Sequence, residues 1–95
     1  MCGIVGYTGG QPAQEIVLES LKKLEYRGYD SSGIAMHEGK LVIYKKKGPI
    51  ENMEAELTES KSTLAIAHTR WATHGVPSDA NAQPHSDEEV SVAVV

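Results

Sequence analysis

One amphipathic helix, predicted over residues 12–24, constrains the fold of this chain more than any other segment. Pro12 suits the first position of a helix, where its missing N–H costs nothing. Apolar residues then recur at helical spacing: Ile16, Val17, Leu18, Leu21 and Leu24. A stripe of this kind has to be buried against another element, so the segments on either side of the helix decide the fold class.

Those other segments read mainly as short strands. Five apolar runs fit a strand, namely residues 2–8, 33–37, 41–46, 63–68 and 90–95. The first run ends at Gly9 and Gly10, which indicates a buried strand that leads into a turn. The second and third are separated by residues 38–40, as expected of a hairpin.

The remaining segments are assigned to a second helix, to turns and to a long loop. Pro49 can open a helix that runs to about Leu57 and turns its apolar residues inward. Asp30 and Ser31 are interpreted as turn and capping groups, and residues 71–88 as loop. The order is a mixture of helices and strands without repeats or a linker. The run 90–95 would leave an unpaired strand edge, through which a homo-oligomer could form.

Composition excludes several classes of protein. The chain has 95 residues, enough for one small domain, and its hydrophobic fraction of 40% is that of a globular protein. A formal net charge of −4, with a single short basic cluster at 45–47, argues against a nucleic-acid surface. One cysteine cannot form an internal disulfide, and no run is long enough to span a membrane or to act as an export signal. We therefore expect a cytoplasmic protein.

Cys2 is the candidate nucleophile. Removal of Met1 would leave the thiol and the free α-amino group on one residue. An α-amino group has a reference pKa of about 7.7 to 8.0 and a thiol about 8.5, so the amine could accept the thiol proton near neutral pH. If Met1 stays attached, the amine is tied up in a peptide bond. From its position alone, Cys2 fits a small buried hydrophobic residue equally well.

The motifs resemble one known family. Signature segments of the glucosamine-6-phosphate synthase family are similar, in order and spacing, to Met-Cys-Gly-Ile-Val-Gly at 1–6, Leu-Glu-Tyr-Arg-Gly-Tyr-Asp-Ser-Ser-Gly at 24–33 and His-Thr-Arg-Trp-Ala-Thr-His-Gly at 68–75. The first segment alone would be weak, since Cys-Gly-Ile also opens the glutaminase domains of amidophosphoribosyltransferase, asparagine synthetase and glutamate synthase. Trp71 and His74 favour the glucosamine-6-phosphate synthase family, because amidophosphoribosyltransferases usually carry Tyr-Ser-Thr after the arginine that matches Arg70.

The resemblance implies a fold and a reaction. The fold would be α+β, a partial and truncated four-layer αββα sandwich of the Ntn-hydrolase, class II glutamine amidotransferase type. Residues 1–95 would be the N-terminal part of that domain, without the sugar isomerase domain. Cys2 would attack the side-chain amide of L-glutamine, form a thioester and release ammonia, and water would then free L-glutamate. The resemblance implies no cofactor.

It also implies the residues that bind the substrate. Arg70 would hold the α-carboxylate of glutamine, a task for which the planar guanidinium fork is suited. Thr73 and His74 would hydrogen-bond the same end of glutamine, and Trp71 would belong to the loop that closes the site and guides ammonia. Arg27 lies in a matching segment, where holding its own turn is as good an interpretation as a role in the site.

The chain departs from the family in two places. The family commonly reads Asn-Ala-His-Pro-His where residues 81–85 read Asn-Ala-Gln-Pro-His; Gln83 is more like the amidophosphoribosyltransferase pattern, whereas His85 matches and stays a candidate. The oxyanion-hole segment His-Asn-Gly and a later substrate-binding aspartate are not among the 95 residues. Because losing one oxyanion donor typically costs about 10² to 10³ in turnover, we expect little or no glutaminase activity from this chain alone.

A metal site is not expected. His68, His74 and His85 have no second cysteine to join them, and their spacing matches no common zinc signature.

Three functional hypotheses follow. The first is the glutaminase half-reaction that serves glucosamine-6-phosphate synthesis, with fructose 6-phosphate as acceptor only in the complete enzyme. The second keeps this chemistry but takes the acceptor of an amidophosphoribosyltransferase-like enzyme. The third is a non-catalytic fragment that binds a ligand or a partner chain through its unpaired edge.

Overall fold

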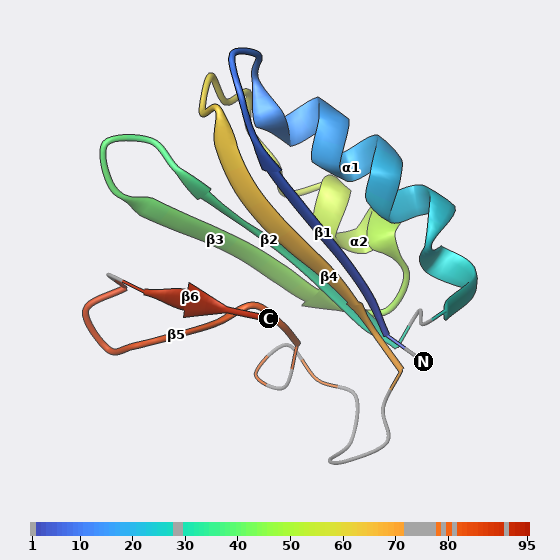
Figure 1. Cartoon of the computed structure of the whole chain (residues 1–95). Coiled ribbons are helices and arrows are strands. Elements are labelled where there is room, and N and C mark those ends of the chain that lie inside the picture. Colours follow the sequence, from blue (N-terminus) through green and yellow to red (C-terminus); the bar gives the residue numbers. More distant parts are fainter. Residues whose placement is uncertain (1, 28–29, 72–77, 79, 81, 91) are drawn as a thin grey trace.

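The computed structural model of the chain describes residues 2–27, 30–71, 78, 80, 82–90 and 92–95. Its elements are β1 (Gly3–Thr8), α1 (Ala13–Lys23), a 3-10 turn η1 (Glu25–Arg27), β2 (Ser31–His37), β3 (Leu41–Lys47), α2 (Ile50–Glu54), β4 (Leu64–Arg70), β5 (His85–Ser86) and β6 (Ala93–Val94). Strands β1, β4, β2 and β3 form one antiparallel sheet in that order, and β5 pairs with β6 as a separate hairpin (Figure 1).

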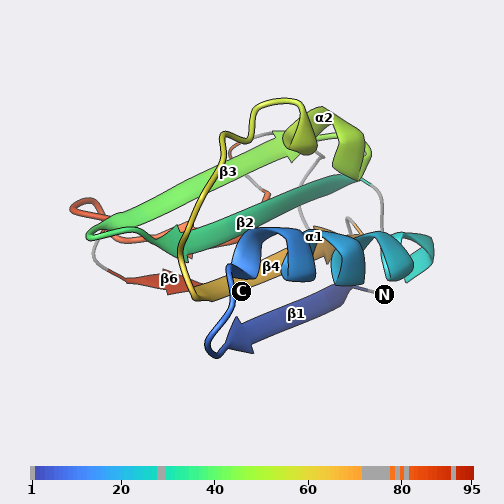
Figure 2. The same cartoon turned by 90° about the horizontal axis from the view of Figure 1, so that it is seen from above.

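The described elements form three layers. Helix α1 packs against β1 and β4, and α2 packs against β2 and β3, so both helices lie on the same face of the sheet (Figure 2). The β5–β6 hairpin lies on the opposite side. This is the predicted mixture of helices and strands, with the predicted helix 12–24 present as α1 and the predicted hairpin turn 38–40 closed by a bond from the N–H of Glu38 to the carbonyl of Lys40 at 2.7 Å.

The hydrophobic core lies between the helices and the sheet. Its fully or almost fully buried side chains come from both helices, β2 and β4: Ala13, Val17, Leu18, Leu21, Ile34, Met36, Ile50, Met53, Ala65 and Ala67. On α1 the buried residues are spaced three and four apart, so one stripe of the helix faces the sheet. None of the helices in the described residues is long and apolar enough to cross a membrane.

Gly3 lets the end of α1 approach the sheet closely. A Cβ at this position would lie 2.8 Å from Thr69 Oγ1 and 2.9 Å from Leu24 Cβ, too near for either to be accommodated without movement. Gly3 pairs with Thr69 across β1 and β4, and Leu24 is the residue at which α1 ends. The absence of a side chain at position 3 therefore sets how closely α1 packs at the end of β1.

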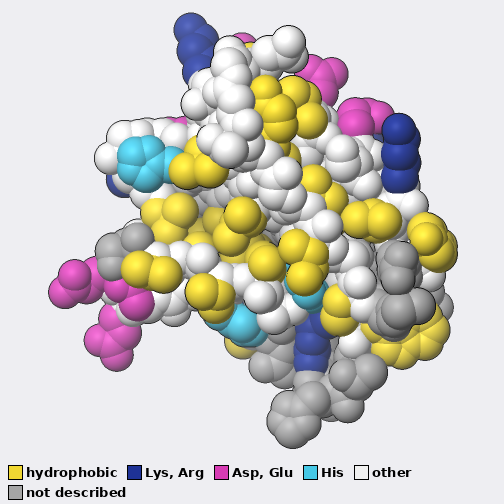
Figure 3. Space-filling view, in the orientation of Figure 1, with side chains coloured by type: hydrophobic (Ala, Val, Ile, Leu, Met, Phe, Trp, Pro, Cys, Tyr) yellow, Lys and Arg dark blue, Asp and Glu magenta, His cyan; other side chains and the backbone are white. Residues whose placement is uncertain are grey.

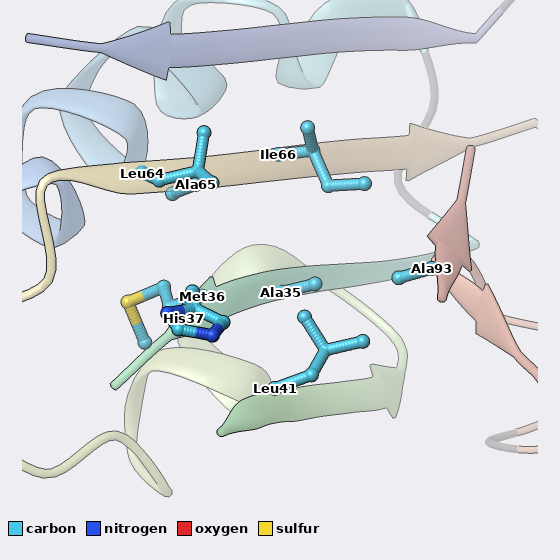
Figure 4. Close-up of a pocket in the computed structure, with 8 residues that line it drawn as sticks. All are labelled: Ala35, Met36, His37, Leu41, Leu64, Ala65, Ile66 and Ala93. Atoms are coloured by element: carbon cyan, nitrogen blue, oxygen red, sulfur yellow. The ribbon is translucent and has the colours of Figure 1, made fainter. Parts of the chain in front are cut away.

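The face of the sheet opposite the helices, here called the open face, is only partly covered. Ile4, on the edge strand β1, is 59% exposed, and Leu64 on β4 is 50% exposed. Hydrophobic side chains gather in the middle of this face (Figure 3). An apolar groove of about 280 Å³ runs between the sheet and β6 (Figure 4), lined by Ala35, Met36, His37, Leu41, Leu64, Ala65, Ile66 and Ala93.

Two predicted elements differ from the structure near the start of the chain. The strand 2–8 is not buried on both faces, because β1 is an edge strand whose burial alternates along its length. Ser31 is not a turn residue: it begins β2, is fully buried, and pairs with both Lys47 and Arg70. An interior strand position, which a local turn pattern cannot reveal, accounts for this difference.

Two more differ further along. Helix α2 ends at Glu54 rather than near Leu57, because the last turn tightens into bonds between residues three apart, although Leu57 does pack against the core as expected. The predicted strand 90–95 shortens to Ala93–Val94, since Val90 has a φ of 53° and Asp87 accepts the N–H of Val92 at 3.0 Å in a turn. One edge of β6 pairs with β5, and its other edge pairs with no strand in the described residues, in agreement with the predicted unpaired edge.

The close packing at Gly3 predicts that adding a single methyl group at this position destabilises the fold. Gly3→Ala should lower the free energy of unfolding by about 1 to 3 kcal/mol, because the new methyl meets the backbone-anchored Leu24 Cβ. Urea denaturation measures this change. Gly6→Ala in the same strand is the matched control, since its Cβ would meet only Ile66 Cγ2 at 4.0 Å. Equal stability of the two variants would contradict the packing described here.

Candidate active site

Cys2 lies directly before β1, at the end of the sheet where β4 finishes. Its side chain is exposed, and its Sγ lies 4.0 Å from the carbonyl oxygen of Trp71, at the limit of a thiol hydrogen bond. Because Gly3 pairs with Thr69, antiparallel pairing of β1 with β4 brings Cys2 beside Arg70 and Trp71. Cys2 is thus a neighbour of two predicted site residues that are far from it in the sequence.

Arg70 is the last residue of β4 and lies between β1 and β2. It is only 9% exposed, and its carbonyl accepts the N–H of Asp30 at 3.1 Å. Side chains alternate along a strand, and Gly3 and Thr69 both face the helices, so Cys2 and Arg70 project from the open face together. A buried cation beside an exposed thiol is an arrangement that can hold an anionic group near a nucleophile.

Trp71 follows β4 immediately and is 47% exposed. This exposure excludes a role as a core packing residue. Thr73 and His74 lie outside the described residues, as does the side chain of Arg27, whose backbone is part of η1.

The segment around His85 packs on the open face near the same end. The carbonyl of Gln83 and the ring of Pro84 lie against Gly33, which has no side chain to keep them away. Gly33 pairs with His68 across β2 and β4. His85 begins β5 and is exposed, and its charge acts on His68. His85 therefore belongs to this end of the sheet, without any hydrogen bond in the described residues that would give it a role.

His68 is a feature of this region that the motif comparison did not assign to the site. It is 3% exposed and lies on the open face two residues before Arg70. Burial, and then the charges of Arg70 and His85, lower the pKa of His68 from 6.5 to about 4. Its Nδ1 has no hydrogen-bond partner among the described residues. The sequence did contain a signal for the place of His68 near the site, since side chains alternate along a strand and residues 68 and 70 therefore share one face.

Known proteins of similar sequence are sugar-phosphate aminotransferases. The glutamine–fructose-6-phosphate aminotransferases (isomerizing) of Clostridium acetobutylicum and Aquifex aeolicus are 52% and 55% identical over 98 residues, and that of Streptomyces coelicolor is 54% identical over 99. Each alignment covers 100% of this chain, which spans only 16–17% of these relatives. No protein-family model matches the chain.

Solved structures of similar fold are amidotransferases. The allosteric regulatory enzyme of purine biosynthesis aligns with a TM-score of 0.77 and 33% identity, over 90% of this chain and 19% of that one. The glutamine phosphoribosylpyrophosphate amidotransferase of B. subtilis, complexed with ADP and GMP, aligns with a TM-score of 0.74 and 30% identity, over 94% and 20%. The chain belongs to the glutamine amidotransferase family.

The family assignment confirms the predicted fold. As a glutamine amidotransferase of the Ntn type, the chain has one helical layer, a four-stranded sheet and the β5–β6 hairpin on the other side of that sheet. The partial αββα architecture predicted from the motifs is therefore correct. The roles of the individual site residues in this amidotransferase remain predictions.

The end of the sheet near Arg70 holds several buried hydroxyl groups. The side chains of Ser31, Ser32 and Thr69 are at most 1% exposed, and none of their oxygens has a hydrogen-bond partner among the described residues. Ser32 pairs with Thr69 on the helix face, whereas Ser31 pairs with Arg70 on the open face. Because an unpartnered buried hydroxyl costs about 1 to 3 kcal/mol, such groups call for an explanation.

The buried His68 of this glutamine amidotransferase predicts a pH-dependent stability. The unfolded chain binds a proton at His68 below pH 6.5, but the folded chain does so only below about pH 4. The free energy of unfolding should therefore fall by up to about 3 kcal/mol as the pH is lowered from 6.5 to 4, and should level off below that.

Urea denaturation at pH 7 and pH 4.5 measures this change in the 95-residue chain. His68→Gln, which cannot be protonated, should lose most of the difference between the two pH values. His37→Gln is the control, since His37 is exposed at the far end of β2 and should leave the difference intact. An undiminished difference in His68→Gln would exclude His68 as its source.

Proposed function

We propose that this chain supplies the nucleophile and the carboxylate-binding residue of a glutaminase. The observation that carries the proposal is the position of Cys2 Sγ, 4.0 Å from the carbonyl of Trp71 and beside the buried Arg70. The thiolate of Cys2 attacks the side-chain amide carbon of glutamine, the C–N bond breaks, and ammonia leaves with the transferred proton. Water then hydrolyses the thioester to glutamate and restores the thiol.

The α-amino group of Cys2 acts as the base once Met1 is removed. The imidazole in the neighbourhood is a poor alternative, because the pKa of His68 is lowered to about 4 and its ring is buried. An ordinary α-amino group, with a pKa of about 8, matches a thiol far better and is attached to the same residue. This comparison supports a nucleophile and base that share one residue.

Arg70 fixes the distance between the nucleophile and the other end of the substrate. Its guanidinium donates two parallel hydrogen bonds to the α-carboxylate of glutamine. Its burial in the sheet supports this role, since a low dielectric strengthens a charge-assisted bond. Thr73 and His74 add hydrogen bonds to the same end of glutamine, and Trp71 belongs to the loop that closes over the substrate.

We also propose that residues 1–95 form the N-terminal part of the glutaminase domain and that fructose 6-phosphate is the acceptor in the whole protein. Identities of 52–55% to aminotransferases named for that sugar phosphate, against 30–33% to the two amidotransferase structures, favour this acceptor. Gln83 favours an amidophosphoribosyltransferase-like acceptor instead. The two acceptors are separated by measuring ammonia release by the full-length protein with fructose 6-phosphate added and with phosphoribosyl pyrophosphate added.

The nucleophile is tested by removing its sulfur. In the full-length protein, Cys2→Ala should lower ammonia release from glutamine by more than about 10³-fold, because no thioester can form. A diazoketone analogue of glutamine should add once to the parent and not to the variant, as intact mass would reveal. Cys2 is the only cysteine in the 95 residues, so a cysteine adduct within residues 1–95 can only be an adduct of Cys2. Retained ammonia release would exclude the proposal.

The carboxylate-binding role is tested by changing the shape of the cation. Arg70→Lys keeps the charge but loses the fork, and should raise the KM for glutamine about 10- to 100-fold with a smaller change in kcat. Steady-state kinetics of the full-length protein measure both. Lys40→Ala, an exposed cation in the turn between β2 and β3, is the control and should change neither. An unchanged KM in Arg70→Lys would place the carboxylate elsewhere.

A further inference from the structure

We propose that Ser31 is a positioning residue, whose hydroxyl accepts a hydrogen bond from the Arg70 guanidinium when glutamine is bound and so holds the guanidinium in the orientation that receives the substrate carboxylate. This inference rests on the proposed function, since it assigns a partner to the cation of the same site. Ser31 was interpreted from the sequence as a turn residue, and the structure instead places it inside the sheet.

The sheet register makes Ser31 a direct neighbour of Arg70. The two residues are opposite one another on β2 and β4, so their side chains project from the same face. In an antiparallel pair, the Cβ atoms of such residues are about 4.5 to 5.5 Å apart, within reach of a hydrogen bond from a long guanidinium. Cys2 lies on the other side of β4 from Ser31, so Arg70 is flanked by the nucleophile and by this hydroxyl.

Because Ser31 is buried, its hydroxyl needs a hydrogen-bond partner within the protein. The side chain is 0% exposed, and its Oγ has no hydrogen-bond partner among the described residues. A hydroxyl has two acceptor lone pairs, and a guanidinium has five N–H donors, of which a bidentate carboxylate takes two. In the glutamine complex, an N–H that does not face the carboxylate can therefore be donated to Ser31, which gives the serine a partner and fixes the orientation of the guanidinium.

Ser32 provides an internal comparison. It is the same residue type, it is 1% exposed, and its Oγ also has no partner among the described residues. Strand alternation turns it to the helix face, where it pairs with Thr69 and not with Arg70. Removing either hydroxyl changes the same number of atoms at the same depth, and only the one at position 31 lies on the face of the site.

The test is steady-state glutaminase kinetics of the full-length protein. Ser31→Ala should raise the KM for glutamine about 5- to 10-fold and leave kcat within about twofold, because the carboxylate is bound less well before and during the reaction alike. Its melting temperature should stay the same or rise, since an unpartnered buried hydroxyl is removed. Ser32→Ala should leave KM and kcat unchanged.

A double-mutant cycle separates positioning from a general structural effect. In the Arg70→Lys background, Ser31→Ala should raise the KM by less than about twofold, because the fork that it orients is already gone. If Ser31→Ala lowers the melting temperature strongly, Ser31→Cys keeps the size of the side chain with a weak acceptor and should raise the KM in the same direction.

Two results would overturn the inference: equal KM values in Ser31→Ala and Ser32→Ala, or an undiminished effect of Ser31→Ala in the Arg70→Lys background. Failure of the proposed function looks different. It appears as ammonia release that survives Cys2→Ala, or as an unchanged KM in Arg70→Lys, whatever the serine variants do.

Discussion

Antiparallel pairing of β1 with β4 is the constraint on which the described site depends. Strand β4 lies inside the sheet, between β1 and β2, and its last residue is Arg70. Because Gly3 is paired with Thr69, the beginning of the chain is held next to the end of β4. A shift of this pairing by one residue would turn Cys2 toward the helices and away from Arg70, so the register matters as much as the residues themselves.

Gly3 and Leu24 protect that register from the other side. The end of α1 rests where a side chain at position 3 would be, and the apolar stripe of the helix extends along β1 and β4. A helix that packs on two neighbouring strands resists their sliding, because a slip would expose the buried stripe. The site is thus supported by the core, although its own residues belong to the opposite face.

Much of the fold could be predicted from the sequence, and the failures have a common cause. Apolar periodicity and turn residues are local signals, and they were enough to predict helix α1, the hairpin between β2 and β3, and the strand β4. Ser31 was misread because its position between two other strands is a property of the sheet. The strand 90–95 was overestimated because its apolar composition conceals a turn at Val90. In the candidate site, motifs predicted roles for Cys2 and Arg70, but only strand pairing shows that His68 and Ser31 lie near them.

The contact between residues 83–84 and Gly33 bears on the departure of this chain from its family at position 83. What touches the glycine is the main-chain carbonyl of Gln83, an atom that every amino acid possesses. Exchange of histidine for glutamine at this point therefore leaves the anchoring of the segment intact and alters only the chemistry that the side chain offers to its surroundings. A change of side chain at position 83 is therefore compatible with the path that the backbone of this chain takes across the sheet.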